Sequence, residues 1–236
     1  MSEPALALER LASRYSEEVY SEKPSRKEVT EKAREMLLEV LGPSGVKEVV
    51  ANCQVASHLV ATRSRGFGSS RFLVAQLALI FLSALGNFFD RRALSFFYER
   101  TIFCSSVLSE EHYEFRDLAT ARVSLNENNL IDALMATGAI PYILEGVRDI
   151  AGAKKGLFWD GGIVDYHFNC PLNIGDELTL YPHYTVDFIP GWFDKAFPWR
   201  RVKELNYNQA LMVCPSSNFL RTLPFGKVPD RKDFEQ

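Results

Sequence analysis

The residues with the clearest capacity for chemistry lie between positions 136 and 162. Ala136-Thr137-Gly138-Ala139-Ile140-Pro141 is a run of small residues that ends in proline, and Asp160-Gly161-Gly162 follows the apolar run Leu157–Trp159. An acidic residue at the end of a strand, followed by two glycines, lies where the backbone can turn sharply and leave the carboxylate exposed. By itself, however, Asp-Gly-Gly is a turn in most proteins.

Two serines have the glycine neighbours that a nucleophilic serine in a G-x-S-x-G elbow would have. Ser44 lies in Gly42-Pro43-Ser44-Gly45-Val46, where valine stands in the place of the last glycine of a G-x-S-x-G elbow. Ser69 lies in Gly66-Phe67-Gly68-Ser69-Ser70, one position too late for that pattern. Neither segment follows a clear apolar strand and opens a helix, as an elbow does. We therefore find no nucleophile in this chain, and use of Ser69 would require a coincidence that the sequence does not support.

Taken together, segments 136–141 and 160–162 resemble the patatin-like phospholipase family. That family has a small-small-x-Ile/Val-Pro segment and then a short strand that ends in Asp-Gly-Gly or Asp-Gly-Ala. The resemblance is strongest over residues 100–166 and extends more weakly over the whole chain. It implies a three-layer α/β/α fold and a Ser–Asp dyad that hydrolyses lipid esters through an acyl-enzyme. It also implies that Asp160 is the base and that Gly161 and Gly162 form its supporting turn.

The sequence departs from the family in two motifs. The Gly-rich loop that forms the oxyanion hole and the G-x-S-x-G elbow are both missing. In family order they precede the first helix, so we expect an N-terminally truncated domain that carries the aspartate, lacks the serine and is inactive as given. Loss of those strands would expose a sheet edge and favour self-association. The alternative is a non-catalytic remnant that binds lipid or a partner protein.

The other reactive side chains indicate neither a cofactor nor a metal. No metal-ligand spacing, G-x-G-x-x-G motif or P-loop is present. The cysteines lack CxxC spacing, so we expect buried, reduced thiols at Cys53, Cys104, Cys170 and Cys214. The four histidines are isolated from one another in the sequence, at His58, His112, His167 and His183. Only His167 is near enough to Asp160 in the sequence to merit a test.

Hydropathy patterns predict strands separated by helices, which is typical of an α/β fold. Helices are predicted over residues 5–20, 72–89 and 130–136, and from a capping box at Ser25 to a stop at Gly42-Pro43. Strands are predicted over residues 54–63, 101–105, 112–115, 121–125, 157–159, 178–187 and 210–214. We place the patatin-like part at residues 1–170 and a C-terminal extension, packed on the same domain, at 171–236.

Residues 72–89 contain no charged side chain and just reach the length of a membrane span. Gln76, Ser83 and Asn87 fall on one helical face. This favours a helix that packs against the rest of the protein, with a lipid-facing surface or lid as the second alternative and a membrane span as the least favoured. Aromatic residues, among them those of segment 191–195, could line an acyl groove or form a membrane-facing rim.

Composition narrows the class of partner. The 236 residues include 27 Lys+Arg and 30 Asp+Glu, a net charge of −3, and 47% are hydrophobic, which is typical of a globular protein. Without a dense basic patch, binding of nucleic acid is not expected. No signal peptide is visible at the first residues. We expect a cytoplasmic protein with a lipid or ester substrate and peripheral membrane contact.

Overall fold

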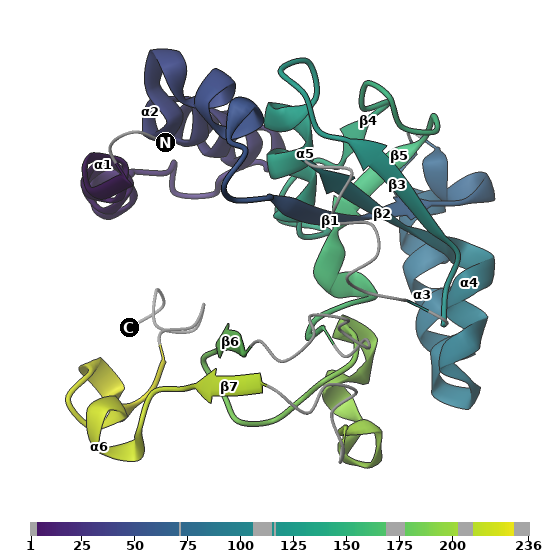
Figure 1. Cartoon of the computed structure of the whole chain (residues 1–236). Helices are drawn as coiled ribbons and strands as arrows, with labels where there is room; N and C mark the ends of the chain where they lie inside the picture. Colours follow the sequence, from purple (N-terminus) through teal and green to yellow (C-terminus); the bar gives the residue numbers. More distant parts are fainter. Residues whose placement is uncertain are drawn as a thin grey trace.

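The chain is described by a computed structural model that covers residues 4–70, 72–105, 115, 117–168, 178–202 and 210–228. Its centre is a five-stranded sheet with the order β3-β2-β1-β5-β4 (Figure 1). The strands are β1 (His58–Ser64), β2 (Tyr98–Cys104), β3 (Thr120–Ser124), β4 (Val147–Arg148) and β5 (Leu157–Asp160). β1 is antiparallel to β2 and β5, β4 is antiparallel to β5, and β2 is parallel to β3. The protein therefore has a mixed α/β fold.

The two central strands hold the most buried part of the sheet. All seven residues of β2 are buried, and they pair with β1 from His58↔Cys104 to Ser64↔Tyr98. Apolar and β-branched residues in both strands suit a sheet that is covered on two faces. The charged Glu99 and Arg100 of β2 are exceptions, and both form ion pairs: the carboxylate of Glu99 accepts from Arg63 and Lys154.

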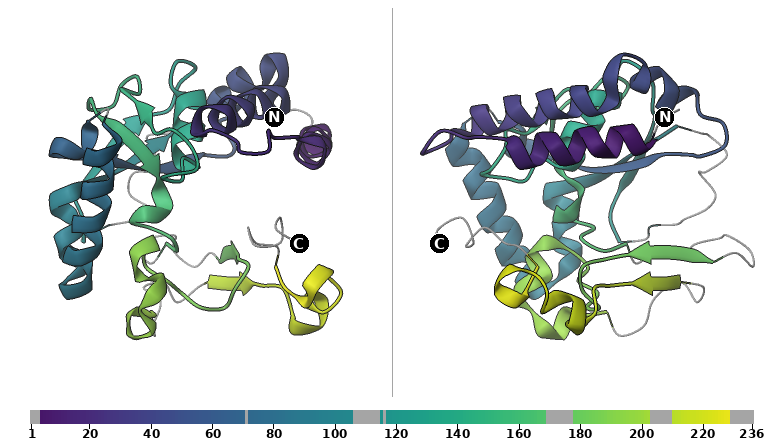
Figure 2. Two further views of the ribbon diagram at one scale, coloured as in Figure 1. Left: turned by 180° about the vertical axis from the view of Figure 1, so that it is seen from behind. Right: turned by 90° about the vertical axis from the view of Figure 1, so that its left-hand side faces the viewer.

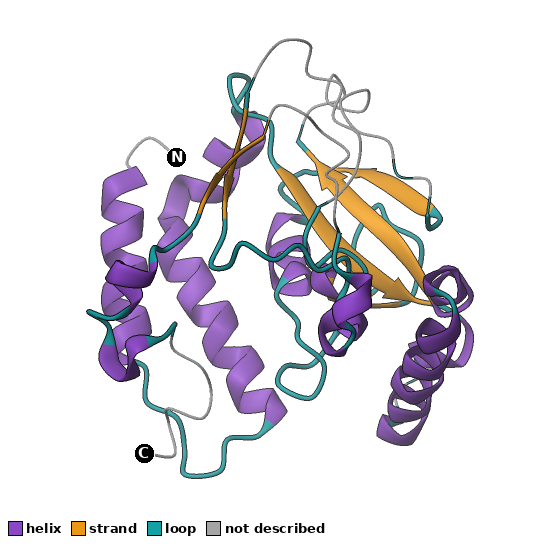
Figure 3. Ribbon diagram, turned by 90° about the horizontal axis from the view of Figure 1, so that it is seen from below, coloured by secondary structure: helices purple, strands orange, loops and turns teal. Residues whose placement is uncertain are grey.

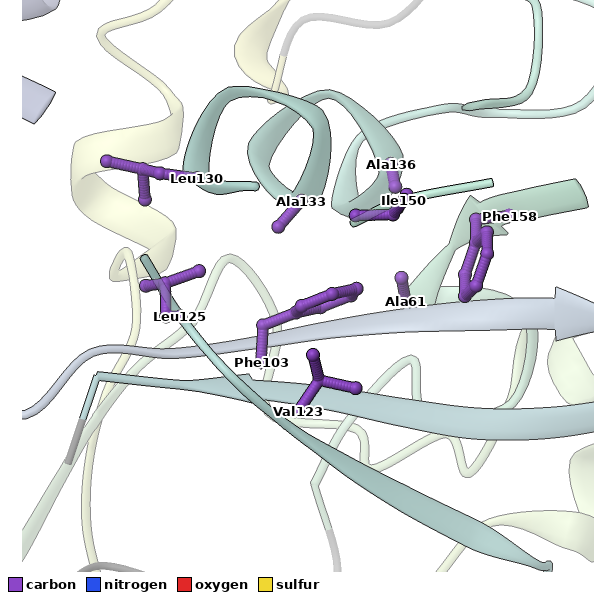
Figure 4. Close-up of a cluster of buried hydrophobic side chains, with 9 residues drawn as sticks. All are labelled: Ala61, Phe103, Val123, Leu125, Leu130, Ala133, Ala136, Ile150 and Phe158. Carbon is purple, nitrogen blue, oxygen red and sulfur yellow. The ribbon is translucent and has the colours of Figure 1, made fainter. Parts of the chain in front are cut away.

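Two helices cover one face of the sheet. Helix α5 (Leu130–Thr137) lies over the strands, and Figure 4 shows Ala133 and Leu130 directed toward the sheet side chains. The cluster consists of Ala61, Phe103, Val123, Leu125, Leu130, Ala133, Ala136, Ile150 and Phe158. Helix α2 (Arg26–Ala51) packs against it through Val46, Val49 and Val50. Helix α1 (Pro4–Glu17) lies beside α2 (Figure 2).

The start of α2 agrees with the sequence prediction, and its C-terminal end differs. Ser25 Oγ accepts the backbone N–H of Glu28 at 3.1 Å, as in a capping box, but the carboxylate of Glu28 accepts bonds from Ser21. The predicted stop at Gly42-Pro43 is wrong. Gly42 has φ 64°, which kinks the helix, and the helix then resumes at Pro43 and reaches Ala51. Proline can begin a helical segment because its missing N–H has no partner there.

A second apolar cluster lies on the opposite side, between the sheet and helices α3 (Leu73–Phe89) and α4 (Leu94–Phe97). The C-terminal residues form a separate pair of parallel strands, β6 (Thr179–Pro182) and β7 (Ala210–Val213), followed by helix α6 (Ser217–Leu220). Figure 3 shows this pair at a distance from the main sheet. Backbone bonds join the two regions, since Tyr166 N–H donates to Pro190 O at 3.0 Å.

Most predicted elements are confirmed to within a few residues, and two strands differ in their bounds. The strand predicted over 54–63 begins only at His58, because the Asn52 side chain accepts N–H bonds from Gln54 and Val55 and turns the chain. The strand predicted over 178–187 ends at Pro182. The strand predicted over 112–115, except for Phe115, and the domain boundary at 170 lie outside the described residues. Within the described part of the chain, no helix is long and apolar enough to cross a bilayer.

Candidate functional site

Asp160 is the last residue of β5 and the first of a tight turn, a 3-10 helix over Gly161–Ile163. Its Oδ1 accepts the backbone N–H of Gly162 at 2.6 Å, which fixes the carboxylate against the turn. Its own N–H donates to Ala139 O at 3.0 Å. The two segments singled out from the sequence, 136–141 and 160–162, are therefore neighbours in the fold.

The two glycines after Asp160 are required by close packing. A Cβ at Gly161 would lie 2.4 Å from the carbonyl oxygen of Val60 in β1, and one at Gly162 would lie 2.7 Å from Asp160 Oδ1. Distances under about 3 Å are not tolerated between such atoms, so a side chain at Gly161 would push the turn away from β1. The glycines let the turn lie directly on the central strand.

Asp160 opens into a cavity of about 180 Å³. The cavity has mainly apolar walls with one carboxylate and one ammonium group, and its lining residues are Ile140, Pro141, Asp160, Gly162, Ile163, Tyr166, Trp192 and Lys195. None of these is serine, threonine or cysteine. A small apolar group could therefore bind beside a carboxylate here.

The surroundings of Asp160 make its carboxylate a better proton acceptor. Burial raises the pKa of Asp160, and the hydrogen bond from Gly162 and the positive charge of Lys195 offset part of that rise. A carboxyl whose pKa is raised binds a proton more readily at a given pH, as general bases in enzymes do.

An ion pair behind the turn anchors it to β2. The fully buried guanidinium of Arg100 donates to both carboxylate oxygens of Asp165, from Nε at 2.5 Å and from Nη2 at 2.6 Å. Asp165 N–H in turn donates to Gly161 O at 2.9 Å. Asp117 also accepts from Arg100, at 3.0 Å. Sequence reasoning did not identify this pair, because nothing local shows that Asp165 meets an arginine 65 positions earlier.

The outer wall of the cavity comes from the C-terminal region, through a 3-10 helix over Trp192–Ala196. Asp194 is fully buried and accepts bonds from Asn87 Nδ2 and Arg91 Nη1, each at 2.8 Å. Trp192 lines the cavity, and Phe193 stacks on Tyr98 with ring centroids 6.3 Å apart. Asp194 is buried, Trp192 and Phe193 are half-buried and Lys195 is exposed, so Trp192 contributes to a cavity wall, while a membrane-facing rim from this segment stays a prediction.

Two of the four histidines, expected to be isolated, form a pair. The Nε2 atoms of His167 and His183 are 2.5 Å apart. Nδ1 of His167 lies 2.6 Å from Ile189 N and 3.0 Å from Ile189 O, and Nδ1 of His183 lies 2.9 Å from Thr185 O and 3.1 Å from Thr185 N. In either pair of neutral tautomers, one ring donates its Nε2–H to the other. Burial, followed by repulsion from His183, lowers the pKa of His167 to about 4. Neither ring lines the cavity, and His112 lies outside the described residues.

The two serines considered as nucleophiles lie away from the cavity lining. Ser69 Oγ donates to Ser64 O at 2.9 Å within a 3-10 helix over Gly66–Ser69, where a loop was predicted. Ser44 lies inside α2, not in a loop, and donates to Glu48. Ser69 Oγ is therefore engaged with a backbone carbonyl, and Ser44 Oγ with a carboxylate on the exposed side of α2, and neither serine lines the cavity beside Asp160.

The remaining expectations concern metals and thiols. In the residues that the structure describes, no group of three or more His, Cys, Asp and Glu side chains could hold a metal ion. Cys104 is buried and Cys214 half-buried, but Cys53 is exposed, so the expectation of buried thiols is wrong at that position. Cys170 lies outside the described part of the chain.

The site thus combines a half-buried carboxylate, an ammonium group and apolar walls around a small cavity, and two regions of the chain contribute to it. Its chemistry is that of a base next to an apolar binding space. Comparisons of the chain with family models, with curated proteins and with solved structures found no match.

Proposed function

We propose that Asp160 is the general base of a patatin-like lipid acyl hydrolase. The observation that carries this proposal is the carboxylate of Asp160 at the end of a strand, with a raised pKa, facing an apolar cavity. Its carboxylate would take the proton of a serine hydroxyl while the serine oxygen attacks an ester carbonyl and the alcohol leaves. Water, deprotonated by the same carboxylate, would then release the acid from the acyl-enzyme.

The walls of the cavity favour an acyl chain as the bound group. Ile140, Ile163 and Trp192 offer apolar contact in the same cavity as the carboxylate of Asp160. The sheet with helices on both faces is compatible with the three-layer arrangement that the family resemblance implies, and a patatin-like fold is part of the proposal.

One observation favours a second candidate, a non-catalytic module that binds lipid or protein. Among the residues that line the cavity, the only hydroxyl is the phenol of Tyr166, which hydrogen-bonds to Tyr184. The hydrolase therefore needs a serine from elsewhere, whereas a binding module needs none.

Labelling with a fluorophosphonate, read by intact mass, separates the candidates. The chain as given and a version extended by any in-frame upstream codons would be compared, each also as Asp160→Asn. The hydrolase predicts an adduct on the extended protein that forms at least about 100-fold more slowly in Asp160→Asn, because loss of a general base costs that much or more. The exposed Asp187→Asn is the matched control and should label normally.

Three results would decide against the proposal. Labelling of the extended protein at an unchanged rate in Asp160→Asn would show that Asp160 is not the base. An adduct on the chain as given, lost in Ser69→Ala, would place the nucleophile at Ser69. No adduct on either version, with quenching of tryptophan fluorescence by a fatty acid, would favour the binding module.

A further inference from the structure

Helix α3 directs polar side chains toward the protein and apolar ones away from it. Ser83 and Asn87 are completely buried, and Asn87 donates to Asp194. In contrast, Val74, Phe81 and Phe89 are 76%, 67% and 77% exposed. A surface helix in water has the opposite arrangement, so this helix needs an apolar environment on its outer side.

The outward residues form one continuous stripe, which we call the α3 face. Its members recur at helical spacing, and they are Val74, Leu77, Phe81, Leu82, Leu85, Phe88 and Phe89. Phe96 of the neighbouring helix α4 is also largely exposed. The 17 residues of α3 extend over about 25 Å, and Figures 1 and 3 show the helix at the periphery of the molecule. No charged residue interrupts the stripe.

Arginines adjoin both ends of α3. At its first turn, Arg148 donates to Ser69 O and Ser70 O, each at 2.8 Å. At its last turn, Arg200 donates to Asn87 O at 2.8 Å, and the exposed Arg92 follows the helix. The exposed carboxylate at this end is Asp90, which accepts the backbone N–H of Arg92. Arginines therefore adjoin both ends of the stripe, and at the C-terminal end Arg92 and Arg200 outnumber the carboxylate of Asp90.

The C-terminal end of the α3 face continues into an aromatic chain. The Phe88 ring lies 5.7 Å from that of Phe197, which lies 5.1 Å from Trp199. Trp199 is 66% exposed. Tryptophan beside apolar surface and arginine is typical of the boundary between lipid tails and head groups.

We infer that the α3 face docks on an anionic lipid bilayer, with the helix lying along the interface. The apolar stripe would enter the acyl region, while the arginines and Trp199 contact the head groups. A second copy of the chain fits less well, because face-to-face helices would bring arginines against arginines whether they ran parallel or antiparallel. The inference goes beyond the proposed function, since it requires neither Asp160 nor catalysis.

Flotation with vesicles tests this surface directly. The vesicles contain phosphatidylcholine alone or with phosphatidylglycerol, and the variant is Phe81→Asp with Leu85→Asp. Leu8→Asp with Tyr15→Asp on α1 is the matched control, because these side chains are 66% and 72% exposed and the charge change is the same. We expect binding to the anionic vesicles, at least about tenfold weaker in the α3 variant and unchanged in the α1 variant. Thermal melting checks that both variants remain folded.

Four results would overturn the inference. The first is failure of the wild-type chain to float with anionic vesicles, and the second is equal flotation of the folded α3 variant. Equal binding to vesicles of phosphatidylcholine alone would show that the arginines do not contribute to membrane binding. A dimer seen by light scattering without vesicles, and dissociated by the α3 variant, would assign the surface to a second copy.

Discussion

Individual residues at the site are held by close contacts with distant parts of the chain. Gly161 lies against the backbone of β1, and Asp160 is fixed by an N–H bond from its own turn and one to Ala139. The carboxylate therefore has one defined position beside the cavity. A base that is already positioned loses little freedom when substrate binds.

Gly161→Ala tests this packing. The new methyl group would collide with Val60 O, so we expect the free energy of unfolding to fall by about 1–3 kcal/mol. Gly138→Ala is the control, because no atom lies within 4 Å of a Cβ at that position. Urea denaturation measures both variants. Equal stability of the two would contradict the close approach of the turn to β1.

The histidine pair predicts a dependence of stability on pH. The folded pKa of His167 is lowered to about 4 from 6.5, so between these values the unfolded chain binds a proton that the folded chain does not. The free energy of unfolding should therefore decrease as the pH falls from 6.5 to 4, by up to about 1.4 kcal/mol per unit. Above pH 6.5 the titration of His167 does not change the free energy of unfolding, and below pH 4 the loss of stability that it causes is complete.

His167→Gln is the variant that isolates this contribution. Glutamine can still donate toward His183 but does not titrate, so its stability should fall less steeply across the same pH window. Urea denaturation at pH values above, within and below the window measures the difference. An unchanged slope would assign the acid sensitivity to other groups.

At the scale of elements, local patterns account for the helices and strands, while buried charges join them. Ser25 caps α2 as its type and position predict, and the uncharged run of α3 forms one regular helix. The connection between β2 and the Asp160 turn is the ion pair of Arg100 and Asp165. Removal of one partner from such a pair leaves the other buried without compensation.

Arg100→Met should therefore destabilise the protein by about 3–5 kcal/mol. The double variant Arg100→Met with Asp165→Leu should recover most of this loss, since no buried charge then lacks its main partner. Arg122→Met, at an exposed position on β3, serves as the control. Urea denaturation of the three variants provides the comparison. If the double variant does not regain stability, the ion pair also determines the shape of the turn.

At the scale of the whole molecule, the cavity exists because the C-terminal region packs on the α/β body. Trp192 and Lys195 complete a wall whose other residues come from the segments around Ile140 and Asp160. Asp194 holds this wall by its bonds to Asn87 and Arg91. The same bonds place the polar side of α3 inward, so the cavity and the orientation of the α3 face depend on one contact.

Asp194→Ala should loosen the wall without unfolding the sheet. We expect amide hydrogen exchange in residues 190–200 to accelerate at least about tenfold, because two buried bonds to a charged group are lost. Exchange in β1 and β2 should change little. The exposed Asp187→Ala is the control in the same region. Uniform acceleration across the sheet would show that Asp194 supports the whole fold instead.

The sequence by itself determined the features that depend on near neighbours. Helical spacing predicted α1, α3 and α5, and alternation and apolar runs predicted β2, β3 and β5, because each pattern lies within a few residues of chain. The position of Asp160 at a strand end followed from the same local pattern. The resumption of α2 after Gly42 was missed, because a kink and a stop have the same local signal.

Only the tertiary structure decided which distant groups meet. It paired Arg100 with Asp165, His167 with His183 and Asn87 with Asp194, and no local pattern indicates such partners. It also decided that the polar stripe of α3 is buried while its apolar side is exposed. The physical reason is that burial and ion pairing depend on the packing of segments separated by tens of residues, whereas helix and strand periodicity depends on the backbone alone.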